Sequence, residues 1–255
     1  MNPPFSYRAF RVWQRNRDVF LHLWKTEMSL AFGEPFLILL AMGYGLGSYV
    51  ALSQGQSYLQ FIAPGIVASY AMYTATSECT YGSYVRMELQ KTFDAIIATP
   101  VNIEDVIAGE IFWAATRSAL TGAIILIVAT LFGLVHSPWA LLILPLMALA
   151  GLMFGAVSMV FTSVVPSINS FNYYFSLFVT PMFFFGGVFF PLNRLPEVVQ
   201  RLAWLVPLTP VVNLSRAMVE GNLHQGLLLD LLYVVVVAAL FFAASLYSMK
   251  KRLII

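Results

Sequence analysis

Six long apolar stretches run through this chain, and they constrain its fold more than any other feature of the sequence. A bilayer core about 30 Å thick needs about 20 mostly apolar residues to be crossed by a helix. The strands of membrane barrels alternate in polarity and do not give continuous apolar runs of this length, so helices are expected. We predict an all-α polytopic membrane protein with six transmembrane helices, at approximately Ser29–Val50, Leu59–Tyr81, Val106–Val135, Pro138–Val164, Phe171–Phe190 and Leu227–Met249.

The composition excludes most other classes of protein. Of the 255 residues, 60% are hydrophobic and only 10% are charged, whereas a soluble domain carries about 25% charged residues. The net charge of +2 is too small to indicate a nucleic-acid partner. A single cysteine, Cys79, excludes an internal disulfide, and the three histidines lack metal-ligand spacing. We therefore expect this chain to bind no metal and no cofactor.

The basic residues indicate which loops face the cytoplasm, because cytoplasmic loops carry an excess of Lys and Arg. Ten of the 14 basic residues lie before the first span, between the second and third spans, or after the sixth. Three others lie in the loop before the sixth span. This distribution predicts that both termini are cytoplasmic.

The segment before the first span, residues 4–25, has the pattern of an amphipathic helix. Aromatic residues form one stripe, and beside it polar residues recur at helical spacing: Arg8, Arg11, Arg15, Asp18, His22 and Lys25. Such a helix is expected to lie in the membrane interface, with its basic face toward anionic headgroups. The alternative is a signal for membrane topology and nothing more.

The loop between the second and third spans is the only long one on the predicted cytoplasmic side. A short helix is expected over residues 87–98, because they present one apolar face at helical spacing: Leu89, Phe93, Ile96 and Ile97. Pro100 should end it, and Asn102 should cap the helix that follows. On these residues alone, an ordinary loop and a docking lever for a cytoplasmic partner remain equal alternatives.

A family resemblance begins in this loop. The run Lys91–Pro100, followed by Gly109-Glu110, resembles the cytoplasmic loop of ABC-2 type exporter permeases, and within them the nodulation-protein-J and polysaccharide-export branch. Each motif is weak alone, but their order and spacing extend over nearly the whole chain. The supporting motifs are Glu34-Pro35, the run Tyr58–Gly65, and Pro181-Met182 with Gly186–Leu192.

The resemblance implies that this loop holds a coupling helix, which sits in a groove of a separate ATPase subunit. The residues that make or shape that contact would be Lys91, Thr92, Phe93, Asp94, Thr99 and Pro100. The chain has no phosphate-binding loop. ATP and Mg²⁺ would therefore bind at the partner ATPase, of which two copies are expected. This chain itself would not be an enzyme. One departure is that the histidine usual in the family after Pro210 is missing here, which weakens inferences about the substrate.

Residues 190–226, before the last span, are too many for a turn and too apolar for a solvated loop. Prolines divide them into two short segments, Glu197–Leu205 and Val211–Glu220. Backbone at membrane depth must satisfy its hydrogen bonds internally, so short helices buried against protein are expected. The resemblance implies a re-entrant helical hairpin that caps the exit path on the outer side. The alternative is an interfacial loop that lies flat.

Four charged residues fall at predicted membrane depth: Glu34, Glu78, Glu110 and Arg117. A charge there costs about 2.5–3.5 kcal/mol on insertion scales, so each is a functional hypothesis. We expect Arg117 to be neutralised by Glu78 or Glu34, which should lie at a similar depth. The charges either fix helix packing or form a polar gate where a headgroup enters the path.

Aromatic residues are the second candidate lining of a path. Tyr173 and Tyr174, in the fifth predicted span, carry hydroxyls that need hydrogen-bond partners. Aromatic belts contact sugar rings in the exporters that this chain resembles, so either tyrosine is a candidate substrate-facing residue.

The sequence therefore predicts one membrane domain over residues 1–255, a permease subunit of an ATP-driven exporter in the bacterial inner membrane. By resemblance it forms a homodimer, contacts membrane lipid and moves an amphiphile outward, most simply a lipid-linked oligosaccharide or lipooligosaccharide. Hydrophobic drugs or other small amphiphiles are the alternative cargo. A secondary transporter without ATPase has less support, because no internal repeat is visible, and a membrane-embedded enzyme lacks a catalytic site.

Overall fold

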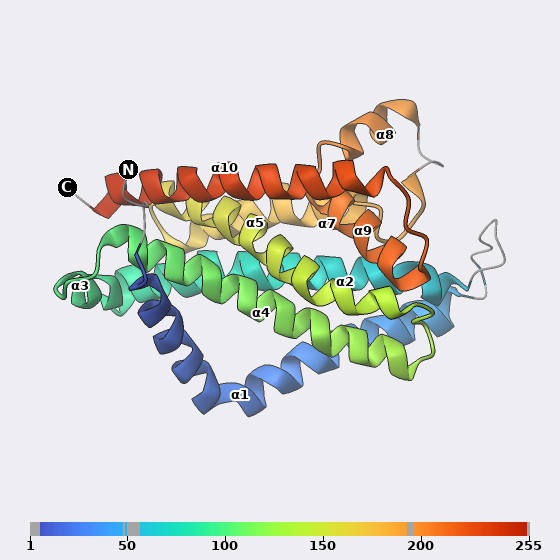
Figure 1. The fold of residues 1–255 in the computed structure, drawn as a ribbon, viewed down its shortest axis with the longest axis horizontal. Coiled ribbons are helices and arrows are strands. Elements are labelled where there is room, and N and C mark those ends of the chain that lie inside the picture. The colour runs from blue at the N-terminus through green and yellow to red at the C-terminus, as the bar shows by residue number, and fades with distance from the viewer. Residues whose placement is uncertain (1–5, 48, 50–56, 193–195, 254–255) are drawn as a thin grey trace.

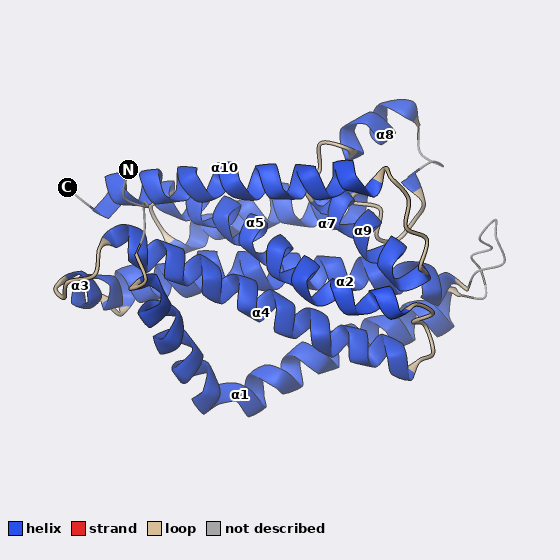
Figure 2. Ribbon diagram, viewed as in Figure 1, coloured by secondary structure: helices blue, strands red, loops and turns tan. Residues whose placement is uncertain are grey.

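The computed structural model describes residues 6–47, 49, 57–192 and 196–253, and all secondary structure in these residues is helical (Figure 2). The long helices run lengthwise beside one another in an elongated bundle (Figure 1). They are α1 (Ala9–Leu40), α2 (Tyr58–Ser77), α4 (Ile103–Leu131), α5 (Ile143–Val164) and α10 (Leu227–Leu253). The short elements are η1 (Ala41–Leu46), η2 (Glu78–Gly82), η3 (Val85–Leu89), α3 (Thr92–Ile97), η4 (Pro138–Leu142), η5 (Ile168–Ser170), α6 (Phe171–Tyr174), η6 (Phe175–Val179), α7 (Thr180–Phe185), α8 (Glu197–Ala203) and α9 (Leu208–Glu220).

Four helices in the described residues are long and apolar enough to cross a membrane: Ala9–Gly43, Ile103–Leu131, Pro138–Val164 and Leu227–Leu253. The second predicted span corresponds to α2, which η2 and η3 prolong as far as Leu89. The fifth corresponds to α6, η6 and α7, which end at Phe185, before the predicted end at Phe190. The helices agree with a polytopic membrane protein, and the number of six spans stays a prediction.

The helix starts follow from local side-chain chemistry. At the start of α2, the Ser57 hydroxyl accepts a hydrogen bond from the Gln60 amide at 3.2 Å, and the Gln60 side chain accepts one from the Ser57 amide at 3.0 Å. At the start of α4, the Asp105 carboxylate accepts a hydrogen bond from the Asn102 amide at 3.3 Å. Both pairs are capping boxes, which satisfy amides left unpaired at a helix start. The prediction that Asn102 caps this helix is confirmed.

The predicted N-terminal helix is the first part of α1. Positions 4 and 5 of the predicted range lie outside the described residues, and α1 begins at Ala9 and continues past position 25 to Leu40. The prediction of a separate helix that ends at residue 25 is therefore wrong at that boundary. The helix continues because no glycine or proline lies between Lys25 and Gly33 to end it. Figure 1 shows that α1 is sharply bent near its middle. We call its first part, residues 9–25, the α1 arm.

Close helix packing surrounds α4, which contacts α1, α2, α5 and α10. A Cβ atom at Gly109 would lie 2.6 Å from the Val12 Cβ, so only glycine lets the α1 arm approach α4 this closely. A Cβ atom at Gly151 of α5 would lie 2.7 Å from the Ala115 Cα of α4. Small residues at such contacts allow membrane helices to pack by close approach of their backbones.

The region before the last span contains the two predicted helices. α8 (Glu197–Ala203) ends before the predicted Leu205, and α9 (Leu208–Glu220) begins before the predicted Val211. α9 is largely buried against α2 and α10, while α8 projects from the bundle (Figure 1). Residues 193–195 of the predicted hairpin lie outside the described residues. Its re-entrant position in a membrane stays a prediction.

Candidate functional site

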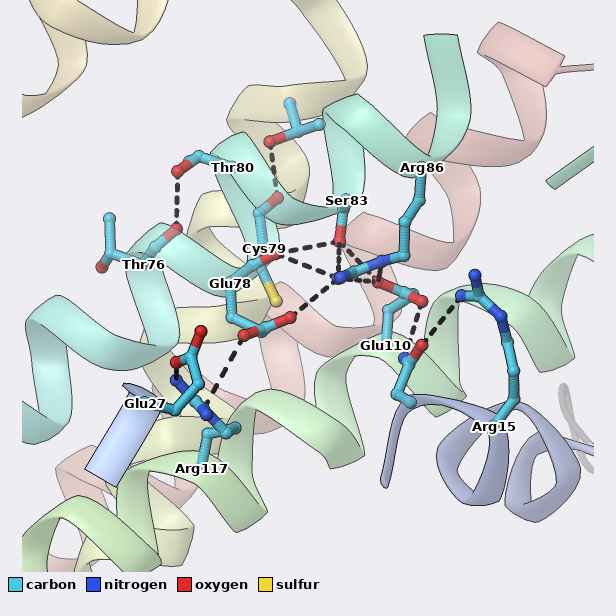
Figure 3. A network of polar contacts seen from close by, with 12 residues as sticks. Arg15, Glu27, Thr76, Glu78, Cys79, Thr80, Ser83, Arg86, Glu110 and Arg117 are labelled. Atoms are coloured by element: carbon cyan, nitrogen blue, oxygen red, sulfur yellow. Dashed lines mark hydrogen bonds and ion pairs between the residues drawn. The ribbon is translucent and has the colours of Figure 1, made fainter. Parts of the chain in front are cut away.

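A chain of alternating charges joins α1, the α2–η3 run and α4 (Figure 3). Its order is Glu27, Arg117, Glu78, Arg86 and Glu110. The successive nitrogen–oxygen distances are 2.6, 3.9, 3.0 and 2.5 Å. Because every inner member has an opposite charge on each side, the chain offsets part of the cost of placing charges in a low-dielectric interior.

Glu110 is the best-satisfied member of this chain, and its side chain is fully buried. Its carboxylate accepts hydrogen bonds from the Arg86 Nε at 2.9 Å, the Ser83 hydroxyl at 2.8 Å and the Asn16 amide at 2.8 Å. The Asn16 side chain in turn accepts one from Arg15 at 3.0 Å. These bonds fasten the α1 arm to α4 and to the end of the α2–η3 run.

Arg117 pairs with Glu78, as the sequence predicts, but Glu27 is its nearer partner. The Arg117 Nε lies 3.9 Å from Glu78 and is buried without a hydrogen bond, while its Nη2 lies 2.6 Å from Glu27. The predicted alternative partner, Glu34, forms no ion pair with Arg117 in the described structure, although both border the same cleft.

Sequence reasoning missed Glu27, which precedes the predicted first span, and Arg86, which counted as a loop charge. Arg86 could have been found from its spacing, because Glu78, Gly82 and Arg86 are four residues apart and such positions share a helix face.

Two clefts meet at Arg117. We call the first, of about 400 Å³, the charged cleft: its lining includes Arg15, Glu27, Glu78, Arg86 and Arg117, beside Val19, Phe20, Leu23 and Trp113. We call the second, of about 380 Å³, the hydroxyl cleft: its lining includes Glu34, Tyr70, Tyr73, Thr74, Ser77 and Thr121. Glu27, Glu78, Gly82 and Arg117 border both. Together the clefts form a polar groove between α1, α2 and α4.

The groove has the chemistry to hold the polar part of an amphiphile. Its carboxylates and hydroxyls can accept and donate hydrogen bonds, and guanidinium groups bind anions through paired N–H donors. Apolar side chains lie beside the charges of the charged cleft. Among the residues that the structure describes, no group of three His, Cys, Asp or Glu side chains could hold a metal ion.

The predicted coupling helix over residues 87–98 is wrong in extent. Residues up to Leu89 belong to η3, and only α3 (Thr92–Ile97) forms a separate helix. Lys91 separates the two with a φ of 52°, in the left-handed region, which a continuous right-handed helix cannot contain. Since the break moves Leu89 off the predicted apolar face, its side chain is exposed. The predicted stop is confirmed, because α3 ends before Pro100.

The six predicted coupling residues divide into an anchor and a surface. The Phe93 side chain is fully buried, and α3 packs on η3 and α4. Phe93 therefore holds α3 on the body of the protein and is not available to an external partner. Thr92 is half-buried. The exposed members are Lys91, Asp94, Thr99 and Pro100.

The two candidate path tyrosines face different surroundings. Tyr174 is buried, stacks on Phe161 at 4.4 Å between ring centroids, and has its hydroxyl 3.3 Å from that of Ser158. The Tyr173 side chain is 71% exposed. Of the two candidates, Tyr173 is therefore the exposed one, and a substrate-facing role for it stays a prediction.

The fold and groove define a class of protein: a helical membrane protein with a polar groove between its long helices, which is typical of transporters. The comparison with known families makes this specific. The chain belongs to the ABC-2 type transporter family, whose model matches residues 8–219. Membership implies a permease subunit that associates with an ABC ATPase, and not an enzyme by itself.

Similar proteins cover nearly the whole chain. Nodulation protein J of Rhizobium meliloti is 34% identical, over 98% of this chain and 96% of its own length. Nodulation protein J of Bradyrhizobium diazoefficiens is 35% identical, over 99% of this chain and 96% of its own length. The inner membrane transport permease YadH of Escherichia coli is 26% identical, over 79% of this chain and 78% of its own length.

Proposed function

We propose that this chain is the permease subunit of an ATP-driven exporter in the bacterial inner membrane, and that it carries an amphiphile outward. The observation that carries the proposal is the polar groove, in which the charged and hydroxyl clefts meet at Arg117. The groove can form hydrogen bonds with a polar headgroup that replace those the headgroup makes with water. Without these replacement bonds, removing the headgroup from water would cost free energy.

The proposed cargo is a lipid-linked oligosaccharide or a lipooligosaccharide. The hydroxyl cleft supports this choice, because sugar hydroxyls pair well with the carboxylate of Glu34 and the hydroxyls around it. The near full-length similarity to nodulation protein J supports the corresponding branch of the family. The alternative cargo is a hydrophobic drug or another small amphiphile, for which the apolar residues of the charged cleft are the better match.

Energy would come from two copies of a separate ATPase, which binds the ATP and Mg²⁺, acting on a homodimer of this chain. The proposed contact is the exposed surface of α3 and the turn after it, formed by Lys91, Asp94, Thr99 and Pro100. Phe93 would keep α3 seated while the ATPase pushes on it, and the bound headgroup would move outward past α9.

Reconstitution into vesicles with the co-purified ATPase tests this function. We expect ATP-dependent movement of a fluorescent lipid-linked trisaccharide and little movement of a hydrophobic dye. Movement of the dye alone would support the alternative cargo. Movement of either probe by the purified chain alone, driven by an ion gradient, would refute the proposal, because a secondary transporter needs no ATPase.

A further inference from the structure

The basic residues at the end of α10 contact both flanks of the α3 loop, which we define as residues 90–102. Arg252 donates a hydrogen bond to the Glu88 carboxylate at 2.9 Å, just before the loop. The Lys250 ammonium lies 2.6 Å from the Glu104 carboxylate, just after it. In Figure 1, α3 and the end of α10 lie at the same end of the bundle. One helix therefore holds the loop at its entry and at its exit.

Arg252 also binds the end of α5. Its Nη1 donates hydrogen bonds to the carbonyl oxygens of Thr162 and Val165, at 2.5 and 2.8 Å. The last carbonyls of a helix are unpaired and carry partial negative charge, so a cation there is favourable. The Arg252 side chain is only 17% exposed. It joins three elements at one point: η3, α5 and α10.

The connection reaches the turn into α3. Glu88, which accepts from Arg252, also lies 3.5 Å from the Lys91 ammonium. Lys91 is the left-handed residue at which the chain turns from η3 into α3. Lys251 differs from its neighbours, because its side chain is exposed and the described structure gives it no ion pair.

We propose that Lys250 and Arg252 fix the α3 loop to α10 and α5, so that a displacement of α3 is passed to these two helices. This inference rests on the proposed function, in which an ATPase pushes on α3. α5 and α10 pack extensively against each other, so they would move as a pair. A partly exposed pair such as Lys250–Glu104 contributes little to global stability. The role assigned here is to position the loop.

The first test measures loop mobility in the full-length chain alone, in lipid nanodiscs. A spin label is attached at an Ala98→Cys substitution, since Ala98 is exposed and the native Cys79 is buried and will not label. We expect a severalfold faster label motion in the Lys250→Gln/Arg252→Gln variant. The control is Lys251→Gln, which removes one basic residue from the same helix end and should leave the motion unchanged. Equal motion in both variants would overturn the proposal.

A charge exchange separates loop positioning from general damage to the fold. Lys250→Glu alone should free the loop, because it places two carboxylates side by side. Adding Glu104→Lys restores the ion pair with its signs reversed and should return the label to the wild-type motion. Failure of this rescue would count against a specific Lys250–Glu104 contact.

The second test uses the complex with the co-purified ATPase. In the Lys250→Gln/Arg252→Gln variant we expect the ATPase to bind as before, with a severalfold lower ratio of trisaccharide moved to ATP hydrolysed. An unchanged ratio together with a freed loop would overturn the role in transmission. A wild-type chain that binds no ATPase would instead refute the proposed function, and the spin-label test, which uses no ATPase, keeps the two failures distinct.

Discussion

At the scale of single residues, the charge chain combines packing and polar exposure. Glu110 is buried and accepts hydrogen bonds from three side chains, as a packing residue should. Arg117 borders both clefts, and its Nε is left without a hydrogen bond. A buried polar atom without a hydrogen bond is unusual and calls for an explanation. The contacts of Glu110 fit the packing alternative, and a gate at Arg117 stays a prediction.

Replacing Arg117 tests whether it gates the groove. We expect Arg117→Met to abolish export, because the long apolar side chain keeps the packing volume but removes the cation between the clefts. Assembly with the ATPase should persist. The measurement is transport of the trisaccharide in vesicles beside co-purification of the ATPase. Arg201→Met is the control, since Arg201 lies on α8 and is largely exposed. Normal export by Arg117→Met would leave packing as the role of this residue.

The sequence located Glu34, Glu78, Glu110 and Arg117 as charges in apolar surroundings, but it could not give their partners. Partner choice depends on where α1 crosses α4. The arm approaches α4 closely only because position 109 is a glycine, and the resulting alignment brings Glu27, rather than Glu34, to Arg117. Such a crossing is set by packing between distant segments, which helical periodicity within one segment does not contain.

At the scale of elements, the local signals were the most reliable. Pro100 and the Asn102 cap fix where α3 ends and where α4 starts, and these two ends follow from nearby residues. The break at Lys91 was missed, because a lysine in the left-handed region is rare and the apolar spacing continues across it. The sequence predicts one helix there, whereas the structure has two elements, η3 and α3, on either side of Lys91.

The division of α3 into anchor and surface predicts opposite effects for neighbouring residues. Phe93→Ala removes a fully buried ring, a change that costs about 3–5 kcal/mol in protein cores. We expect faster hydrogen exchange of the α3 amides in the chain alone. Asp94→Ala, at an exposed position, should leave this exchange unchanged and instead weaken stimulation of the ATPase. Unchanged exchange in Phe93→Ala would refute the anchor role.

The contact between the α1 arm and α4 can be tested at one glycine. Gly109→Ala should displace the arm, because the new Cβ would lie 2.6 Å from the Val12 Cβ and 2.7 Å from the Ala9 carbonyl oxygen. Disulfide cross-linking between cysteines placed on the arm and on α4 should then fall. Gly33→Ala is the matched control, since nothing lies within 4 Å of the new atom and replacing a helical glycine removes an entropic cost of about 0.5–1 kcal/mol. Equal cross-linking in both variants would contradict this packing.

At the scale of the whole molecule, the bundle places different features at its two ends. α3, the start of α1 and the end of α10 lie at one end (Figure 1). The loop between α9 and α10 lies at the other. The Lys and Arg distribution predicts that the first end is cytoplasmic. The architecture and the positive-inside pattern thus agree on which segments should share a side of the membrane.

Labelling with a membrane-impermeant maleimide tests this orientation. Thr99→Cys should be protected in intact cells and become reactive after the membrane is permeabilised. Gln225→Cys, in the loop between α9 and α10, should react in intact cells. The unmodified chain is the control, because its single cysteine is buried. The reverse pattern would invert the topology and exclude α3 as a site for a cytoplasmic ATPase.

The unbroken course of α1 has a practical consequence. The arm that is hydrogen-bonded to α4 and the stretch that carries Glu27 and Glu34 beside the groove belong to one bent rod, with no hinge loop between them. We expect a change of bilayer thickness or of lipid charge at the inner surface to tilt α1 and so to alter the width of the polar groove. Lipid composition should therefore be held constant whenever transport rates of variants are compared.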